Sequence, residues 1–330
     1  MKKKIKTVVT GGAGFIGSHI VEALARQGHD IIVLDNLSCG YLDNLKSVAR
    51  DIAFFKKDVS DLSSILEHFK GVDLVFHLAA LADIVPSIVE PYKYCKANID
   101  GTIAVLEAAR LNKVKKIVYA ASSSCYGIPT VYPTAEDAGI QPQYPYAFSK
   151  YIGEQCCLFW AKLYKLSVVS LRIFNVYGPR SRTSGAYGAV MGVFLAQKLA
   201  GLPFTVVGDG NQTRDFIYVT DVAQGFIKAA DSKISNEVFN LGAGKPQSIN
   251  KLVSLIGGEK IHIPKRPGEP DCTWADIRKI RKLLNWQPKV SFEEGINLIL
   301  HNIDYWKNAP VWTPEKIEAA TRDWFKYLKR

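Results

Sequence analysis

Blocks of apolar and amphipathic residues alternate along the first half of the chain. Helical periodicity extends over Phe15–Gln27 and over about 61–69, 92–112 and 147–164. Strands that alternate with helices predict a parallel sheet covered by helices on both faces. Short apolar runs that predict buried strands lie at Lys6–Thr10, Asp30–Leu34, Ile52–Phe55, Leu74–Leu78, Lys116–Ala120 and Val168–Phe174.

The pattern changes after Asn175. Residues 180–215 are rich in Gly, Ser and Arg, with one helical stretch near 189–200, and Phe216–Gly225 is interpreted as a return to the sheet. The chain is irregular from about 244, and 311–330 predicts an amphipathic helix. We therefore predict an α/β fold, a Rossmann-type doubly wound parallel sheet with a smaller α/β C-terminal substrate lobe. The sheet domain would comprise 1–178 with a returning segment at about 215–243, and the lobe would comprise 179–214 and 244–330.

Composition narrows the class of partner. The chain has 330 residues, 22% of them charged, and a net charge of +11 that suits an anionic ligand. Lys and Arg are scattered and no nucleic-acid motif is present, so we expect a phosphorylated metabolite and no nucleic acid. Six cysteines without a CxxC pair predict reduced thiols, no metal site and a cytoplasmic protein. The first apolar run, Ile5–Thr10, is too short for a signal or membrane segment.

A glycine-rich turn joins the first predicted strand to the first helix. Gly11, Gly14 and Gly17 have the spacing GxxGxxG. The first glycine permits the tight turn, the second lets a pyrophosphate approach the helix N-terminus, and the third lets helix and strand pack closely. Such a pattern alone also fits a structural turn, but its position between strand and helix predicts a dinucleotide site.

Acidic residues after the next strands narrow the cofactor. Asp35 ends the second strand, eighteen residues after Gly17, where a carboxylate accepts hydrogen bonds from a ribose 2′-hydroxyl and repels a 2′-phosphate. This favours NAD over NADP. Asn36, directly after Asp35, would assist it in binding the ribose. Asp58 and Val59 follow the third strand and would meet the adenine, although Asp58 also fits a helix N-cap.

Two patterns suggest proton-transfer chemistry. Tyr146 and Lys150 form a YxxxK pair on one face of a predicted helix, and a nearby ammonium lowers a phenol pKa from its usual ~10. The phenol would then exchange a proton with a sugar hydroxyl as a hydride moves. Taken alone, the pair also fits a surface helix. Three serines, Ser122–Ser124, follow the strand at 116–120, at the end of a parallel sheet where ligands bind.

In this order, the motifs resemble those of an extended short-chain dehydrogenase/reductase of the nucleotide-sugar epimerase/dehydratase family. The similarity runs from Thr7 to about Ile296. It is carried by TGGAGFIGSH (10–19), Asp35-Asn36, Asp58, HLAA (77–80), NIDGT (98–102), SSSCYG (122–127), YAFSK (146–150), RIFNVYGPR (172–180), GDGNQTRDFIYVTDV (208–222) and RPGEPDCTWAD (266–276).

The resemblance implies a site for each group. Tyr146 would be the acid/base, Lys150 its tuner and a ligand of the nicotinamide ribose, and Ser122 the catalytic hydroxyl, with Ser123 and Ser124 as second choices. Arg214 and Arg266 would pair with the substrate diphosphate and nucleoside, a role that suits the planar guanidinium. The expected NAD contacts are Gly11, Gly14, Phe15, Ile16, Gly17, Asp35, Asn36, Asp58, Val59, Leu78, Ala79, Ala80, Asn98, Tyr146 and Lys150. The expected nucleotide-sugar contacts are Asp83, Ser87, Ser122, Asn175, Ala189, Val190, Arg214, Arg266, Glu269 and Thr273.

The residues around the serines discriminate among the reactions of similar proteins. A 4,6-dehydratase needs an acid and a base, Asp-Glu, directly after its catalytic Thr, where this chain has Ser123 and Ser124. Similar decarboxylases have Glu at the place of Ser124, and 3,5-epimerase/reductases have a Cys two residues before the loop tyrosine, whereas Cys125 is one before Tyr126. C4 epimerisation is the favoured hypothesis. A C4 dehydrogenase or ketoreductase with net NAD(H) turnover uses the same residues and stays open. An NAD-binding regulator without activity is disfavoured because Tyr146 and Lys150 are both present.

Two departures bear on the substrate. Asp83 stands where similar epimerases often have Ser, and it would accept hydrogen bonds from sugar hydroxyls or lie in a solvated loop. Thr273 occupies a position where glucose-restricted 4-epimerases have Tyr, which predicts room for an N-acetyl group at C2. The nucleotide (UDP, GDP or dTDP) stays open.

The resemblance also implies a homodimer that forms through the helices at about 92–112 and 147–164. These stretches carry apolar residues beyond one face (Tyr94, Val105, Phe159 and Trp160), which alternatively lie buried within one chain.

Overall fold

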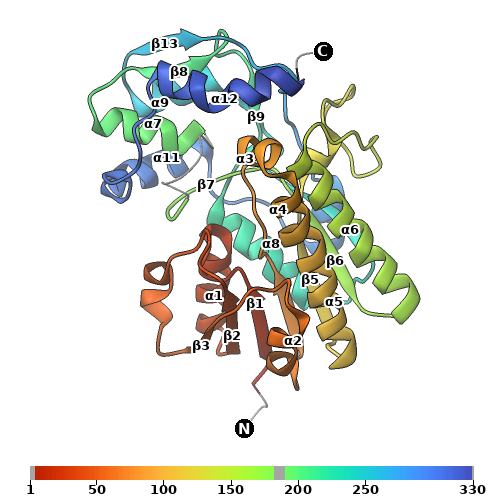
Figure 1. Cartoon of the computed structure of the whole chain (residues 1–330). Coiled ribbons are helices and arrows are strands. Elements are labelled where there is room, and N and C mark those ends of the chain that lie inside the picture. The colour runs from red at the N-terminus through yellow and green to blue at the C-terminus, as the bar shows by residue number, and fades with distance from the viewer. Residues whose placement is uncertain (1–3, 182–189, 329–330) are drawn as a thin grey trace.

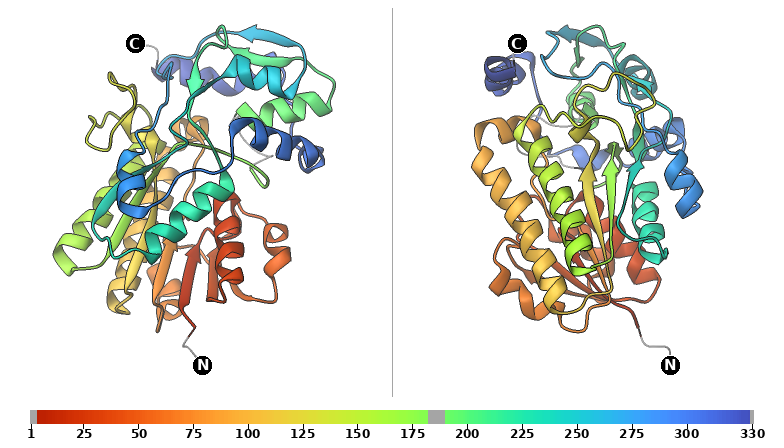
Figure 2. Two further views of the ribbon diagram at one scale, coloured as in Figure 1. Left: turned by 180° about the vertical axis from the view of Figure 1, so that it is seen from behind. Right: turned by 90° about the vertical axis from the view of Figure 1, so that its right-hand side faces the viewer.

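The computed structural model describes residues 4–181 and 190–328. A seven-stranded parallel sheet forms its centre, with helices on both faces (Figures 1 and 2). The strand order is β11-β6-β5-β4-β1-β2-β3. The bounds are β1 Lys6–Thr10, β2 Asp30–Asp35, β3 Ile52–Lys56, β4 Leu74–His77, β5 Lys116–Ser122, β6 Val168–Ile173 and β11 Glu237–Leu241. The predicted Rossmann-type sheet is confirmed.

Successive residues of the central strands point to opposite faces, as the two-residue period of a strand requires. Val8 packs with α5 (Gly101–Leu111) and α6 (Pro145–Tyr164), whereas Val9 packs with α1 (Phe15–Arg26) and α8 (Val219–Asp231). Both side chains have no exposed surface. The apolar runs lack a polar face because helices cover both sides of the sheet.

A smaller lobe sits over the carboxyl ends of the strands, at the top of Figure 1. Its apolar cluster includes Phe204, Trp306 and Ile317. The lobe contains α7 (Val190–Leu199), α9 (Ile249–Ile256), α11 (Phe292–His301), η5 (Ile303–Trp306), α12 (Pro314–Leu328) and the parallel strands β8 (Phe204–Val207) and β13 (Lys260–Ile263). Two further pairs join it to the central domain: β7 (Asn175–Tyr177) with β10 (Phe216–Tyr218), and β9 (Thr213–Arg214) with β12 (Gln247–Ser248).

The remaining elements are short. They are α2 (Leu62–Ile65), α3 (Ile84–Val89), α4 (Pro91–Cys95) and α10 (Arg278–Leu284), with the short 3-10 helices η1 (Leu42–Val48), η2 (Leu66–Phe69) and η4 (Ser123–Tyr126) and the π-helical turn η3 (Lys96–Asp100). Across 4–181 and 190–328, no helix has the length and apolarity needed to cross a membrane.

The interpretation of Phe216–Gly225 as a strand of the main sheet is wrong. Phe216–Tyr218 pairs with β7 outside that sheet, and Val219–Asp231 is helix α8. The strand that does return is β11, which pairs with β6. A short apolar run fits either element, and here the packing of α8 beside α1 decides.

Candidate active site

A cavity of about 810 Å³ lies between the carboxyl ends of the strands and the C-terminal lobe. This is the edge of an open α/β sheet where ligands bind, and the volume suits a dinucleotide beside a second ligand.

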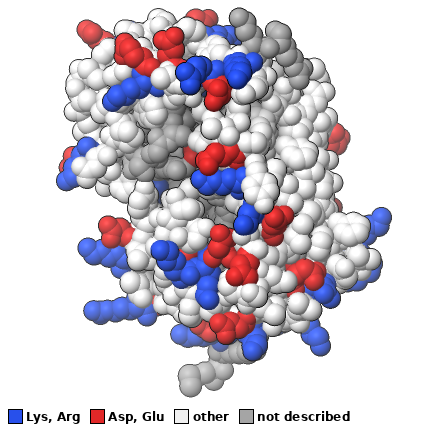
Figure 3. All heavy atoms as spheres, viewed as in Figure 1, with Lys and Arg blue, Asp and Glu red and all other residues white. Residues whose placement is uncertain are grey.

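On the face shown in Figure 3, acidic and basic side chains are interspersed over the surface. That face therefore presents no concentrated basic patch of the kind that a nucleic acid binds.

The glycine turn forms one wall of the cavity. Gly11 has φ +69°, and a Cβ there would lie 2.6 Å from the backbone nitrogen of Ala79. A Cβ on Gly17 would collide with the carbonyl of Gly11. Gly14 caps α1 without a side-chain hydrogen bond, so the first amides of α1 are left for a ligand. The turn has the backbone approach and the helix end that a pyrophosphate needs.

Asp35 lines the cavity at the end of β2. Its carboxylate accepts hydrogen bonds from the backbone nitrogens of Ala13 (3.0 Å) and Leu37 (2.8 Å), and burial raises its pKa. These bonds hold the carboxylate in place and leave lone pairs for further donors. Asp58 also lines the cavity and accepts hydrogen bonds from the backbone and hydroxyl of Ser60. Both acids therefore face the end of the cavity that an adenosine would occupy.

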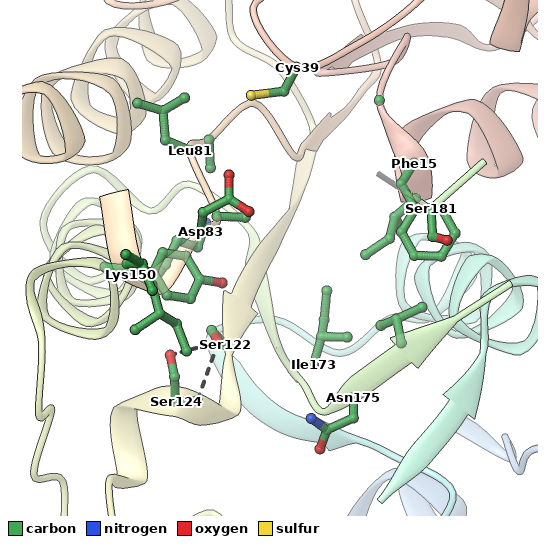
Figure 4. A pocket seen from close by; sticks show the side chains of 18 of the residues that line it. Phe15, Cys39, Leu81, Asp83, Ser122, Ser124, Lys150, Ile173, Asn175 and Ser181 are labelled. Atoms are coloured by element: carbon green, nitrogen blue, oxygen red, sulfur yellow. Dashed lines mark hydrogen bonds between the residues drawn. The ribbon is translucent and has the colours of Figure 1, made fainter. Parts of the chain in front are cut away.

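Hydroxyl groups gather at the end of β5 (Figure 4). Ser122 caps the turn η4, and its Oγ lies 2.8 Å from the Oγ of Ser124. The Ser122 hydroxyl is near enough to the Tyr146 phenol to lower its pKa, and the Ser124 hydroxyl has the same effect on Tyr144. Pro145 begins α6, so Tyr146 lies in its first turn and Lys150 one turn later. Ser122, Ser123, Ser124, Tyr146 and Lys150 all line the cavity.

The electrostatics of this pair differ from the sequence expectation. Burial raises the pKa of Tyr146, although the nearby Ser122 hydroxyl opposes this effect. Burial also lowers the pKa of Lys150 to about 8. The Lys150 ammonium lies 4.3 Å from the centre of the Tyr119 ring, a cation–π contact that keeps it beside the cavity. The expected lowering of the Tyr146 pKa is therefore wrong for the chain by itself, because burial disfavours the charged tyrosinate.

The opposite wall is built from the C-terminal half of the chain. The Thr273 hydroxyl donates to Asn175 Oδ1 (2.7 Å) and accepts from the backbone nitrogen of Asp215 (3.0 Å). Asn175 and Thr273 both line the cavity. The Thr273 bond fixes which way the Asn175 amide points, so its nitrogen remains for a ligand oxygen.

Two arginines and one carboxylate form the far end. Arg214 Nη2 lies 2.7 Å from Glu269 Oε1, and Arg266 Nη1 lies 3.8 Å from Glu269 Oε2. Glu269 Oε2 is buried and has no hydrogen-bond partner among the described residues. A buried acceptor between two guanidinium groups suits a ligand that carries both hydroxyl groups and anionic oxygens.

Most of the expected contacts line the cavity, including the glycine turn, Leu78, Ala79, Ala80, Asp83 and Val190. Asn98 and Ser87 do not. Asn98 is buried and bonds the backbone of Leu81 and the hydroxyl of Ser149, so it supports the wall from behind. Ser87 is fully buried and donates to the carbonyl of Ile84. Ala189 lies outside the described residues.

Sequence reasoning missed several lining residues. Tyr144, Trp312 and Trp324 face the cavity, the last two from the C-terminal stretch. Only Tyr144 had a local signal, since it lies two residues before Tyr146. Within the described ranges, no group of His, Cys, Asp or Glu is arranged to hold a metal ion.

A buried ion pair anchors helix α6 to the sheet. Arg172 on β6 binds Glu154 on α6 at 2.7 Å, and both side chains are almost fully buried. Glu154 also accepts from the Ser170 hydroxyl, and Arg172 donates to the Tyr126 hydroxyl. Glu154 lies one turn after Lys150, so this network fixes where α6 presents Tyr146 and Lys150 to the cavity.

Comparison with known proteins shows one consistent relationship. Residues 7–242 match the NAD dependent epimerase/dehydratase family. A UDP-glucose 4-epimerase of Mycolicibacterium smegmatis is 38% identical over 303 residues, which cover 88% of this chain and 96% of that protein. The crystal structure of a UDP-glucose 4-epimerase from Thermotoga maritima with UDP-glucose has a TM-score of 0.86 and 35% identity, covering 92% of this chain and 99% of that one. A UDP-N-acetylglucosamine 4-epimerase from Methanobrevibacter ruminantium, in complex with UDP-N-acetylmuramic acid, has the same TM-score and identity and covers 91% and 99%.

Proposed function

We propose that this chain, which belongs to the NAD dependent epimerase/dehydratase family, inverts C4 of a UDP-hexose or UDP-N-acetylhexosamine through a transient 4-keto sugar. NAD is the cofactor, and when bound it would supply reversible hydride transfer at C4. The observation that carries this proposal is the hydroxyl cluster of Ser122, Ser124 and Tyr146 beside Lys150 at the carboxyl end of β5.

Each side chain has a chemical task in this reaction. Tyr146 accepts the proton of the C4 hydroxyl as the C4–H bond breaks, and returns it when the hydride comes back to the other face of the keto sugar. Ser122 donates a hydrogen bond to the reacting oxygen. Lys150 stabilises the tyrosinate and holds the nicotinamide ribose.

The two positions after Ser122, which hold the acid and the base in similar dehydratases, are both serine in this chain. Ser123 and Ser124 line the cavity directly after Ser122, and neither side chain ionises near neutral pH. Oxidation and reduction at one carbon need no further acid or base. This favours epimerisation over 4,6-dehydration.

The far end of the cavity fits the rest of the substrate. Arg214 and Arg266 would bind the diphosphate, Glu269 would accept from hydroxyl groups of the nucleoside, and Asn175 would bind phosphate or sugar oxygens. Thr273 would leave room for a C2 N-acetyl group.

The test is incubation of the purified protein with a panel of UDP-, GDP- and dTDP-sugars. Sugar products are followed by NMR, and the cofactor by absorbance at the NADH band. We expect the C4 epimer of a UDP-sugar with no net NADH. Stoichiometric NADH would instead identify a dehydrogenase, and loss of water from the sugar a dehydratase.

We also propose a homodimer built on α4, α5 and α6. Tyr94 and Val105 are buried within the chain, which corrects their expected place at an interface, whereas Phe159 is exposed. Other exposed apolar side chains on these helices are Tyr92, Leu111, Phe148, Leu163 and Tyr164. Such a face is unusual on a monomer and suits a second copy.

We also propose a cellular location, a domain division and a metabolic role for the protein. The free cysteines of the described residues suit a reducing compartment such as the cytoplasm. We propose that residues 1–178, with a returning segment at about 215–243, form one domain. Residues 179–214 and 244–330 would form the discontinuous lobe. A role in carbohydrate metabolism, such as polysaccharide biosynthesis, follows from the proposed substrate.

A further inference from the structure

The C-terminal helix α12 forms part of the cavity, although it lies outside the residues that match the family. It packs against α3 at the top of the molecule (Figure 1). Its Trp324 is only 3% exposed and faces the cavity together with Tyr144, Arg266 and Gly268. The helix therefore reaches the site through one large side chain.

That indole joins two parts of the site. Its Nε1 donates to the carbonyl of Pro267 (2.6 Å), and the Arg266 guanidinium carbon lies 5.6 Å from its ring centre. On the other side, the Tyr144 ring lies 6.1 Å away, and Tyr144 stacks in turn on Tyr146 at 6.5 Å with nearly parallel rings. Trp324 thus contacts the loop that carries Arg266 and the residue that precedes helix α6.

We propose that Trp324 is a positioning residue, which holds Arg266 and the 266–270 loop in place to receive the diphosphate of a nucleoside-diphosphate sugar. The inference rests on the proposed function, because the diphosphate is part of that substrate. An arginine side chain loses much conformational freedom when it binds an anion. The indole face and the hydrogen bond to Pro267 restrict that freedom before the ligand arrives. Trp324 acts on binding and takes no part in the chemical step.

The test compares Trp324→Ala and Trp324→Phe with Tyr327→Ala in the full chain loaded with NAD. Tyr327 lies on the same helix but is 61% exposed, so its removal controls for disturbance of α12. The readouts are KM and kcat for the UDP-sugar, the Kd of UDP by calorimetry, and Tm. We expect Trp324→Ala to raise KM and the Kd of UDP about ten-fold, with kcat within about two-fold of the wild type. Trp324→Phe keeps a ring but loses the N–H donor, so we expect a rise of about three-fold. Tyr327→Ala should change neither constant.

The proposal is overturned if both Trp324 variants lower Tm but leave KM and the Kd of UDP unchanged, since Trp324 would then support only the fold. That result would leave the epimerase proposal intact. Failure of the wild type to bind UDP would refute both. If Trp324→Ala does not fold, the Kd of UDP for Trp324→Phe decides.

Discussion

Lys150→Met is expected to abolish most turnover and yet stabilise the protein without cofactor. Lys150 is 4% exposed, and burial lowers its pKa from 10.5 to about 8. Each pKa unit corresponds to about 1.36 kcal/mol, so keeping this lysine charged at neutral pH costs about 3 kcal/mol of folding free energy. Methionine has a similar length and no charge. It loses the cation–π contact with Tyr119, worth about 0.5–2 kcal/mol. The net expectation is a gain of about 1–3 kcal/mol.

The pH dependence of stability tests the sign of this free-energy change. Between about 8 and 10.5 the unfolded chain binds more protons at this site than the folded chain, so the stability of the wild type rises with pH over that interval. Below pH 8 the cost is complete. The advantage of Lys150→Met should therefore be largest at neutral pH and shrink as pH approaches 10.5.

The measurement is Tm of the cofactor-free protein from pH 7 to 10. An unfolding entropy of about 2.1 cal/mol/K per residue predicts a rise of about 1–4 °C at pH 7 for a chain of this size. Lys162→Met is the control, because Lys162 is an exposed lysine on the same helix α6, and we expect little change. Turnover of Lys150→Met should fall by about 10²-fold or more. A lower Tm than the wild type at pH 7, or a difference that does not vary with pH, would refute the argument.

The remaining predictions concern neighbouring parts of the site. Tyr146→Phe should abolish turnover while NAD still binds, as measured by activity and calorimetry; surviving activity would contradict its role as acid and base. Glu154→Gln should destabilise the protein by about 3–5 kcal/mol in urea unfolding, because it leaves Arg172 buried without its counter-ion, whereas Glu90→Gln in an exposed pair should cost about 1 kcal/mol or less. Equal losses of stability in Glu154→Gln and Glu90→Gln would show that the buried ion pair matters no more to stability than the exposed one. Thr273→Tyr should lower kcat/KM for N-acetylated UDP-sugars more than for plain UDP-sugars. If turnover of both kinds of sugar stayed unchanged, Thr273 would not determine the room for a C2 N-acetyl group.

Local sequence patterns predicted the features that depend on neighbours in the chain. An apolar run such as Val8–Val9 predicts a strand buried on both faces when it lies between helical segments, and a turn that needs φ +69° at Gly11 needs glycine. Tyr146 and Lys150 share a helix face because they are four residues apart. The positions that line the cavity near the cofactor follow from such rules and from the fact that parallel strands all end at one edge.

Long-range packing decided the features that local sequence patterns predicted wrongly. Whether the apolar run after Phe216 becomes strand or helix depends on the space beside α1, which no local pattern contains. Asn98 and Ser87 lie within suitable motifs, but their side chains bond the backbone of the wall instead of facing the cavity.

Trp324 shows the same limit for the site. Its partners are Pro267, 57 residues earlier, and Tyr144, which directly precedes α6. Spacing along a chain carries no information about side chains that meet only when a C-terminal helix closes over the sheet. The sequence by itself determined the sheet, the glycine turn and the helix face that Tyr146 and Lys150 share, because each depends on short-range geometry. The tertiary structure decided the pKa shifts of Tyr146 and Lys150 and the far wall of the cavity, because burial and contact are properties of the folded chain.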